Sequence, residues 1–283
     1  MKAKFIFLGS GGSMGVPEIP CTCATCGSFE PKNKRLRPSA LLQVADKNFV
    51  IDIGPDFRIQ ALNAGIHSLE GLFITHAHFD HTACIDELRV FSLFTKENVH
   101  CLVPEPTFKD LQKRFYYLFE QSPSTFDPSK DNQKAQISFQ VISQERSSGN
   151  FRGLSFRSFR FFQGKMPVHG YRFKNFAYVT DIRTYSESIF EDLVGVDTLV
   201  LSASSVNPNK IHFSLPDAID FAKKVRAQRV YFTHMSHRID YLKDRKDLPQ
   251  GMDLAYDGLE LDVEIDYERP IESPSGRSLS PKR

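Results

Sequence analysis

The sequence lacks any long hydrophobic run. A membrane-spanning helix needs about 18 or more consecutive apolar residues, and no stretch of the chain reaches that length. Residues 1–8 are basic and then apolar, but their apolar part is too short for a signal peptide and leads directly into a glycine-rich turn. We therefore expect a first β-strand at this position and no contact with a membrane.

The sequence also lacks an excess of charge of one sign. Lysine and arginine together number 36 against 34 aspartate and glutamate residues, which leaves a formal net charge of +2. A chain this close to neutral has little electrostatic attraction for nucleic acid or for an anionic membrane surface. Since no basic arm is visible either, the sequence argues against a nucleic-acid partner.

Cysteine is scarce and odd in number. Of the five cysteines, three lie within residues 21–26, and Cys84 and Cys101 stand alone. An odd count in a chain without a secretion signal points to reduced thiols in the cytoplasm rather than to disulfides. The two isolated cysteines are expected to be buried apolar residues.

The cysteine cluster is a candidate zinc site. Cys21, Cys23 and Cys26 would supply three thiolates from one loop, and a structural zinc ion needs four ligands. His237 is the candidate for the fourth, because it lies three residues beyond another predicted ligand, His234. Three free thiols are the alternative interpretation.

Segments typical of strands and helices alternate along the chain, with no internal repeat. The chain has 283 residues, 41% of them hydrophobic, which is enough for one large or two small domains. Residues 122–134 are expected to form a mobile loop, residues 144–153 a further loop and residues 267–283 a disordered tail. Asp56 is expected to cap a helix that runs through Ile66. The expected strands are 4–8, 39–44, 48–53, 99–103, 135–142, 154–162, 176–180, 197–201, 229–233 and 252–264, and the expected helices are 56–66, 85–94, 107–121 and 215–227.

Residues 75–81 form the most informative segment. They read Thr-His-Ala-His-Phe-Asp-His and follow an apolar run. On a strand, His76 and His78 would face one point, and a helix starting near Phe79 would direct Asp80 and His81 into the same space. Zinc and manganese favour such mixed imidazole and carboxylate ligands. Two ligand pairs so close together predict two metals that activate water for hydrolysis, with a histidine-rich surface turn as the alternative.

Further ligand candidates follow strands in the second half of the chain. Asp181 comes directly after the strand at 176–180, His234 comes after the strand at 229–233, and His212 lies in a loop. One such residue alone more often serves as a structural hydrogen-bond partner. Because ligands collect beyond the strand ends of α/β sheets, their combination with residues 75–81 makes them candidates for the metal site.

These motifs resemble the metallo-β-lactamase superfamily over nearly all of residues 2–266. The segment at 76–81 is the central signature of that superfamily, and Asp181 and His234 match its bridging aspartate and late histidine. Within the superfamily, the chain is similar to the cyclic-phosphate phosphodiesterases of the carbon–phosphorus lyase pathway. That similarity is carried by residues 15–26, 233–237 and 248–260.

The resemblance implies an α+β fold, a four-layer αββα sandwich, over residues 1–266, with a zinc-loop insertion at 16–38. It implies a structural Zn²⁺ in the loop and two divalent ions, Zn²⁺ or Mn²⁺, in the active site. The implied ligands are His76 and His78 for the first ion, Asp80, His81 and His234 for the second, Asp181 between the two, and Cys21, Cys23, Cys26 and His237 for the structural zinc.

The implied function is that of a metal-dependent hydrolase, a phosphodiesterase acting on a small, cyclic or linear phosphodiester. Asp80 or Asp181 would orient the attacking water or take its proton, and His212 would bind the phosphate or protonate the leaving oxygen. The same fold also supports hydrolysis of a thioester or a lactam. The sequence leaves the oligomeric state open and is compatible with a homodimer.

One residue departs from the pattern of the family. Relatives have a third histidine for the first metal, at the position where this chain has Gln163. An amide oxygen is a neutral and weaker ligand for such metals. The first site is therefore expected to be weak, to be empty in practice, or to be rescued by His169. A degenerate, non-catalytic metal-binding protein is the further alternative.

Overall fold

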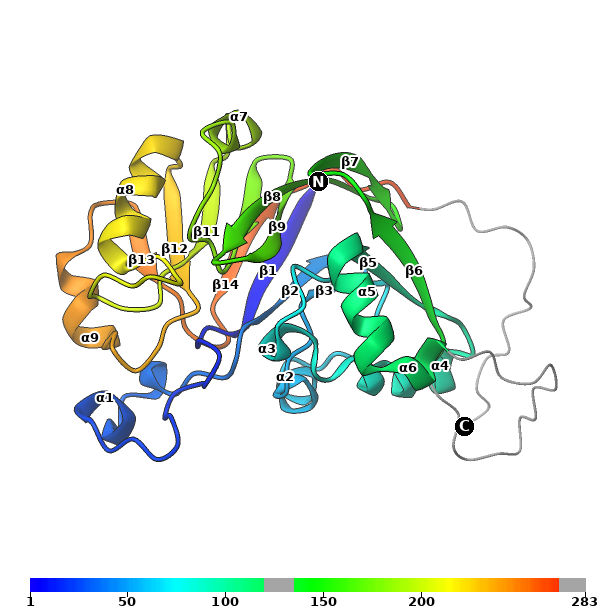
Figure 1. Ribbon diagram of the computed structural model, residues 1–283, viewed down its shortest axis with the longest axis horizontal. Helices are drawn as coiled ribbons and strands as arrows, with labels where there is room; N and C mark the ends of the chain where they lie inside the picture. The colour runs from blue at the N-terminus through cyan, green and yellow to red at the C-terminus, as the bar shows by residue number, and fades with distance from the viewer. Residues whose placement is uncertain (120–134, 270–283) are drawn as a thin grey trace.

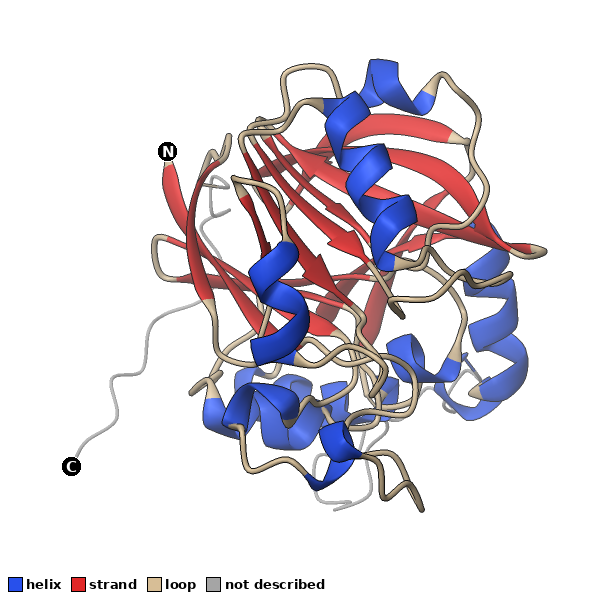
Figure 2. Ribbon diagram, turned by 90° about the vertical axis from the view of Figure 1, so that its left-hand side faces the viewer, coloured by secondary structure: helices blue, strands red, loops and turns tan. Residues whose placement is uncertain are grey.

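In the described part of the chain, two β-sheets of seven strands each form the centre of the molecule, with helices on the outside (Figures 1 and 2). The computed structural model describes residues 1–119 and 135–269. Buried apolar side chains from both sheets share one core, and two further cores lie between a sheet and its helices. The predicted four-layer αββα sandwich is thereby confirmed.

The first sheet has the strand order β14-β1-β2-β3-β4-β5-β6. Its strands are β1 (Lys2–Gly9), β2 (Ser39–Val44), β3 (Lys47–Ile51), β4 (Gly71–Phe73), β5 (Val99–Pro104), β6 (Ile137–Ile142) and β14 (Glu260–Glu264). Pairing is antiparallel from β14 to β3 and parallel from β3 to β6. The carboxyl ends of β3, β4 and β5 therefore meet at one edge of the sheet, where ligands collect in such folds.

The second sheet has the order β13-β12-β11-β10-β9-β8-β7. Its strands are β7 (Arg146–Phe151), β8 (Leu154–Gln163), β9 (Met166–Phe173), β10 (Phe176–Val179), β11 (Thr198–Ser202), β12 (Arg229–Thr233) and β13 (Met252–Leu254). Pairing is antiparallel from β7 to β10 and parallel from β10 to β13. The carboxyl ends of β10, β11 and β12 consequently share an edge as well.

The helices flank the two sheets. They are α1 (Ala24–Gly27), α2 (Phe57–Asn63), α3 (Phe79–Thr82), α4 (Leu88–Thr95), α5 (Glu105–Arg114), α6 (Tyr116–Phe119), α7 (Ile189–Asp192), α8 (Leu215–Val225) and α9 (Tyr241–Asp244). In Figure 1, α8 lies beside β11 and β12, whereas α2 to α6 lie on the side of the first sheet. Among the described residues, every helix is too short or too polar to cross a membrane.

Aromatic packing between the sheets holds β4 in place. The side chain of Phe73, the last residue of β4, is fully buried. Its ring centroid lies 5.0 to 5.2 Å from those of Phe151, Tyr171 and Phe173 in the second sheet, in edge-to-face contacts. The hydroxyl of Tyr171 also donates to the backbone oxygen of Ile74, 2.6 Å away. The chain that leaves β4 is thus anchored to the opposite sheet.

Several element predictions are wrong. The strand predicted at 252–264 is divided between β13 in one sheet and β14 in the other, because the chain crosses between the sheets at 255–259. The helix predicted at 107–121 breaks at Phe115. Residues 144–153, predicted as a loop, contain β7.

Two local predictions also need correction. Asp56 precedes α2, but its carboxylate accepts hydrogen bonds from the backbone N–H and guanidinium of Arg37 instead of capping the helix. The predicted tail at 267–283 begins later than expected, since Tyr267 forms a β-bridge with Leu154 and Glu268 donates to Gly153. Residues 122–134 and 270–283, predicted to be mobile or disordered, lie outside the described residues.

Candidate metal centre

Residues from both sheets meet where the parallel strands end. The loop after β4, Asp181 two residues after β10, and His234 directly after β12 bring imidazoles and carboxylates together in a buried cluster. Within each of three groups, the potential ligand atoms lie within 4.8 Å of one another. The groups are His76, His81 and Asp181; Asp80, His81 and His234; and Asp181, His212 and His234.

The two histidines of the motif are close together, but not for the predicted reason. Strand β4 ends at Phe73, so His76 and His78 lie in the loop that follows and not on a strand. Their rings still approach, with His76 Nε2 and His78 Nδ1 separated by 2.9 Å. Helix α3 begins at Phe79, as predicted, and places Asp80 Oδ2 at 3.3 Å from His81 Nε2.

Asp52 orients two of these histidines, and its role was missed in the sequence. Its carboxylate lies 2.6 Å from His81 Nδ1 and accepts hydrogen bonds from the backbone N–H and hydroxyl of Thr75, both at 2.8 Å. Because that hydroxyl donates to Asp52, its lone pair is free to accept from His76 Nδ1, 3.0 Å away. Both imidazoles thus present Nε2 to the centre, the arrangement that carboxylates impose on metal-binding histidines. The available signal in the sequence was the position of Asp52 directly after β3, the strand that pairs with β4.

The electrostatics of the cluster favour a cation. Burial acts to raise the pKa of Asp80 and of Asp181, but the imidazoles of His81 and His234 outweigh this and hold both pKa values below the ordinary value. Burial lowers the pKa of His76, whereas the neighbouring carboxylates raise the pKa of His81 and of His234 despite burial. Two ionised carboxylates are therefore enclosed with imidazoles at neutral pH.

Unpartnered polar atoms test whether the residues fit a metal. Buried polar atoms in proteins nearly always have a hydrogen-bond partner. Among the described residues, His81 Nε2 and Asp181 Oδ1 are buried without one, and they face each other's side chains in the cluster. Since these atoms belong to the predicted ligand set, and imidazole with carboxylate suits zinc and manganese, the residues present fit divalent metal ions.

Gln163 lies at the edge of this cluster. It is the last residue of β8, and its side chain is only 6% exposed. Its amide nitrogen is 2.8 Å from His212 Nε2, and His212 Nδ1 is 3.5 Å from Asp181 Oδ1. Burial lowers the pKa of His212 to about 4. The structure thus brings Gln163 and His212 together beside the predicted bridging aspartate.

His169 does not join the cluster. It is buried in β9, and its backbone N–H donates to the oxygen of Thr75. Burial lowers its pKa to about 4. It belongs to none of the potential ligand groups found among the described residues, so the structure offers no support for rescue of the first site by His169.

The four predicted ligands of the structural zinc also come together. Nδ1 of His237 lies 3.1 Å from Cys21 Sγ, 3.6 Å from Cys26 Sγ and 3.8 Å from Cys23 Sγ. Three sulfurs and one imidazole match the donor set of closed structural zinc sites. Cys101 is buried as predicted, and Cys84 is half-buried.

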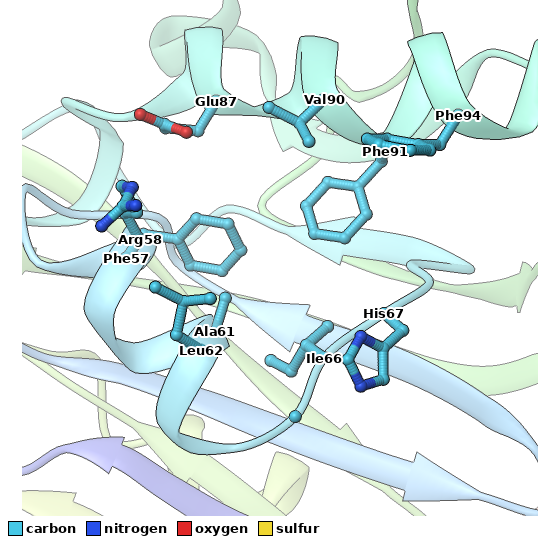
Figure 3. A pocket seen from close by; sticks show the side chains of 11 residues that line it. Phe57, Arg58, Ala61, Leu62, Ile66, His67, Glu87, Val90, Phe91 and Phe94 are labelled. Carbon is cyan, nitrogen blue, oxygen red and sulfur yellow. The ribbon is translucent and has the colours of Figure 1, made fainter.

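An apolar pocket of about 540 Å³ lies apart from the metal centre, between α2 and α4 (Figure 3). The rings of Phe57 and Phe91 and the side chain of Ile66 line it, with Arg58 and Glu87 at one end. Of the described residues that line this pocket, none is a predicted metal ligand. We assign it no part in the chemistry.

Comparison with known proteins gives a consistent family. Residues 47–235 match the family described as Beta-lactamase superfamily domain. The crystal structure of a diphosphatase of the PhnP family is 34% identical, with a TM-score of 0.85, and the alignment covers 94% of this chain and 99% of that one.

Other matches extend the picture. Zn²⁺-bound PqqB from Methylobacterium extorquens is 17% identical, with a TM-score of 0.71, over 92% of this chain and 100% of its own, and shares the fold alone. An octanoyltransferase of Porphyromonas gingivalis is 30% identical over 262 residues, which are 91% of this chain and 51% of that protein. This chain therefore spans about half the length of that curated relative.

Proposed function

The chain belongs to the β-lactamase superfamily and is a metallo-β-lactamase-fold hydrolase, and from this premise we propose that it is a metal-dependent phosphodiesterase. Its substrate would be a small phosphodiester, cyclic or linear. The observation that carries the proposal is the buried group of Asp80, His81, His234 and Asp181 at the strand ends. Similarity to a PhnP-family diphosphatase over nearly the whole chain supports phosphorus as the centre attacked.

Two divalent ions, Zn²⁺ or Mn²⁺, would be held by residues of the cluster. Asp80, His81 and His234, which form one group of potential ligands, would hold one ion. His76 and His78, whose rings approach to 2.9 Å, would hold the other, although His78 is in none of the potential ligand groups among the described residues, and Asp181 would be shared between the two ions. When bound, such ions lower the pKa of water and neutralise charge that develops on phosphate oxygens. A third ion, the structural Zn²⁺, would occupy the cysteine site.

The side chains of the protein position the reacting groups. The low pKa of Asp80 and of Asp181 keeps both ionised at neutral pH, so that either can accept a hydrogen bond from the attacking water and orient it. In the reaction a bond forms from water oxygen to phosphorus, the ester bond breaks, and the leaving oxygen gains a proton. His212, beside Asp181 at the edge of the cluster, would face the phosphate.

The proposal also includes the setting of the reaction. Free cysteines and the near-neutral charge of the chain support a cytoplasmic protein that acts on a small molecule without nucleic acid or membrane. A homodimer is the assembly we propose to test first, by measuring the mass in solution.

Substitution of Asp80 tests the activity. The Asp80→Ala variant is expected to lower the turnover of a generic aryl phosphodiester by about 100-fold or more, because the carboxylate that orients water is removed. Asp220→Ala is the matched control, since its carboxylate is exposed on α8, and it should keep full activity. Undiminished turnover by a clean Asp80→Ala preparation would overturn the proposal.

A second candidate function is hydrolysis of an acyl thioester. It is favoured by the similarity to a protein named an octanoyltransferase, and the same fold supports attack on carbon. An aryl phosphodiester and an octanoyl thioester should be assayed side by side with the wild type and Asp80→Ala. If the wild type hydrolyses only the thioester and Asp80→Ala does not, thioester hydrolysis would replace phosphodiester hydrolysis as the proposed function.

A further inference from the structure

The guanidinium of Arg114 contacts the loop that carries two predicted metal ligands. Arg114 is the last residue of α5, and its Nη2 lies 2.7 Å from the backbone oxygen of Ala77 and 3.0 Å from Oγ1 of Thr82. Ala77 lies between His76 and His78, and Thr82 is the last residue of α3. A cation at the end of α5 therefore donates both to the loop and to the helix on which predicted ligands lie.

The hydroxyl of Thr82 extends this contact to His78. The side chain of Thr82 is buried, and its Oγ1 lies 2.8 Å from the backbone oxygen of His78 and 3.3 Å from that of Ala77. The shorter distance selects His78 as the main acceptor. A hydroxyl has one proton and two lone pairs, so Thr82 donates to His78 and at the same time accepts from Arg114. The carbonyls of two consecutive loop residues are thereby connected to one nitrogen of the guanidinium.

The guanidinium is itself held in place. Nε of Arg114 donates to the carboxylate of Asp110, one turn earlier on α5, and the planar group then fixes the direction of its other N–H bonds. Helix α5 does not depend on this cation for its packing, because Leu111 is fully buried and the ring of Phe108 packs on that of Phe139, with centroids 5.2 Å apart. The contact with the loop thus needs an explanation beyond attachment of the helix.

His78 has little other support in the described part of the chain. The carboxylate of Asp52 orients His76 and His81, but among the described residues the ring of His78 has a hydrogen-bond contact with His76 alone. The position of His78 therefore depends on its backbone, whose oxygen accepts from Thr82 and from the N–H of His81, 3.1 Å away.

We propose that Arg114 is a positioning residue for the metal-binding loop, which it holds through the carbonyl of Ala77 and the hydroxyl of Thr82. His78 is thereby kept within reach of the first ion, the one assigned to His76 and His78. The affinity for the first ion consequently depends on Arg114 more than the affinity for the second, whose predicted ligands lie outside the loop. The inference rests on the ligand assignment of the proposed function and is independent of the substrate.

Titration with Mn²⁺ tests this dependence. The full chain, depleted of active-site metal, is titrated in a calorimeter both as the wild type and as Gln163→His, which restores an imidazole to the first site. In both, Arg114→Ala is expected to weaken binding of the first ion by about 10-fold or more and to leave the second nearly unchanged. Lys109→Ala, at an exposed position on the same helix, is the matched control and should change neither. Unchanged affinity for the first ion, or an equal loss for both ions, would overturn the proposal.

Two further variants test the route of the effect. Arg114→Lys keeps the charge and still donates, although without the planar fork of arginine, so it should recover part of the affinity lost in Arg114→Ala. Thr82→Val keeps the size of threonine without its hydroxyl and should also weaken the first ion. Combined with Arg114→Ala, it should cost less than the product of the two single losses, because both residues act through one chain of hydrogen bonds. A loss equal to that product would overturn the route through Thr82.

Electron paramagnetic resonance separates positioning of the loop from simple attachment of α5. In Gln163→His loaded with two Mn²⁺ ions, we expect the spectrum of a magnetically coupled pair. At the same metal concentration, addition of Arg114→Ala should give the spectrum of isolated Mn²⁺, whereas a role in helix attachment alone would leave the pair spectrum intact and overturn the proposal.

Failure of the proposed function would be recognised separately. If Gln163→His binds a single Mn²⁺ ion in the centre, the ligand assignment is wrong, and the inference fails with it. If it binds two ions but neither it nor the wild type cleaves a phosphodiester, the proposed activity is wrong, while the result for Arg114 stands on its own.

Discussion

Three residues of the metal centre have a backbone conformation that side chains normally avoid. Asp52, Asp181 and His234 have φ angles of 63°, 56° and 58°, in the left-handed region that favours glycine. Each lies just after a strand, β3, β10 or β12, where the left-handed residue turns the chain. Such conformations cost about 1–3 kcal/mol each and cluster at functional sites. At the scale of the residue, the packing of the sheets offsets this conformational cost and holds the three side chains toward one point.

Asp52 provides a prediction at this scale. The carboxylate of Asp52 accepts hydrogen bonds from His81 and Thr75. In Asp52→Asn, an amide nitrogen, which can only donate, takes the place of one carboxylate oxygen and disturbs these hydrogen bonds. We expect the affinity of the centre for Zn²⁺ or Mn²⁺ to fall by about 10–100-fold, measured by calorimetric titration of metal-depleted protein.

The matched control for Asp52 is Asp46→Asn. Asp46 pairs with Arg269 at an exposed position, and its substitution should leave the metal affinity unchanged. Equal affinities for Asp52→Asn and the wild type would show that His76 and His81 need no orientation by the carboxylate.

At the scale of the element, one short segment joins the two metal sites. His234 belongs to the buried cluster and His237 to the cysteine site. Between them, Met235 exchanges hydrogen bonds with the loop after β1, through Ser10 and Gly12. The guanidinium of Arg35, a residue only 2% exposed, donates to the oxygens of Ser236 and Ile239. The cysteine-bearing insertion is thereby attached to the segment that positions His234.

This attachment predicts that the two sites are coupled. Loss of zinc in Cys26→Ser should loosen the segment and reduce the metal affinity of the buried centre by about 5-fold or more, the lower end of typical couplings between sites. Titration of the centre in Thr22→Ala, an exposed change in the same loop, is the control. If Cys26→Ser loses its zinc but the buried centre binds its metal with unchanged affinity, the two sites are not coupled, and hydrogen bonds alone hold the segment in place.

Strand β4 allows a test of packing at the same scale. Phe73→Ala removes a ring that contacts four aromatic residues of the opposite sheet, and should lower the free energy of unfolding by about 3–5 kcal/mol. Phe94→Ala, at a ring that is 85% exposed, should change it by less than about 0.5 kcal/mol. Denaturant titration of both variants measures the difference, and equal values would contradict the packing described for β4.

At the scale of the whole molecule, neither sheet contains a complete metal centre. The first sheet supplies Asp52 and the histidine motif, and the second supplies Asp181 and His234, so the centre exists only where the two sheets pack together. The second sheet also supplies Gln163, from the end of β8. The resemblance predicts an imidazole where Gln163 offers a neutral amide, so under the proposed ligand assignment the His76 side has fewer strong ligands than the His234 side.

The number of bound metals follows from this asymmetry. Protein purified without chelator is expected to contain two tightly bound ions per chain, one in the cysteine site and one held by Asp80, His81 and His234. Gln163→His should raise the number to three, because it restores an imidazole to the weaker side. Elemental analysis of both proteins gives the answer. Three ions in the wild type would show that Gln163 does not weaken the first site.

Local patterns in the chain were sufficient for much of this description. The cysteine cluster, residues 75–81, and Asp181 and His234 after their strands are visible as spacing and chemistry, because ligand types and strand signals are local properties. The alternation of strands and helices and the start of α3 at Phe79 were also predicted correctly. The division of residues 252–264 between two sheets was not, since a run of alternating residues does not reveal a crossing between layers.

The sequence by itself determined which residues are able to bind metals, since an imidazole, a thiolate or a carboxylate has the same chemistry wherever it lies. Only the tertiary structure decided which of them act together. It placed Asp52 behind His81, brought His237 to the cysteines, left His169 outside the cluster and set Gln163 against His212. Hydrogen bonds and coordination act over a few ångströms, and distances of that order between segments far apart in the chain arise only when the two sheets pack.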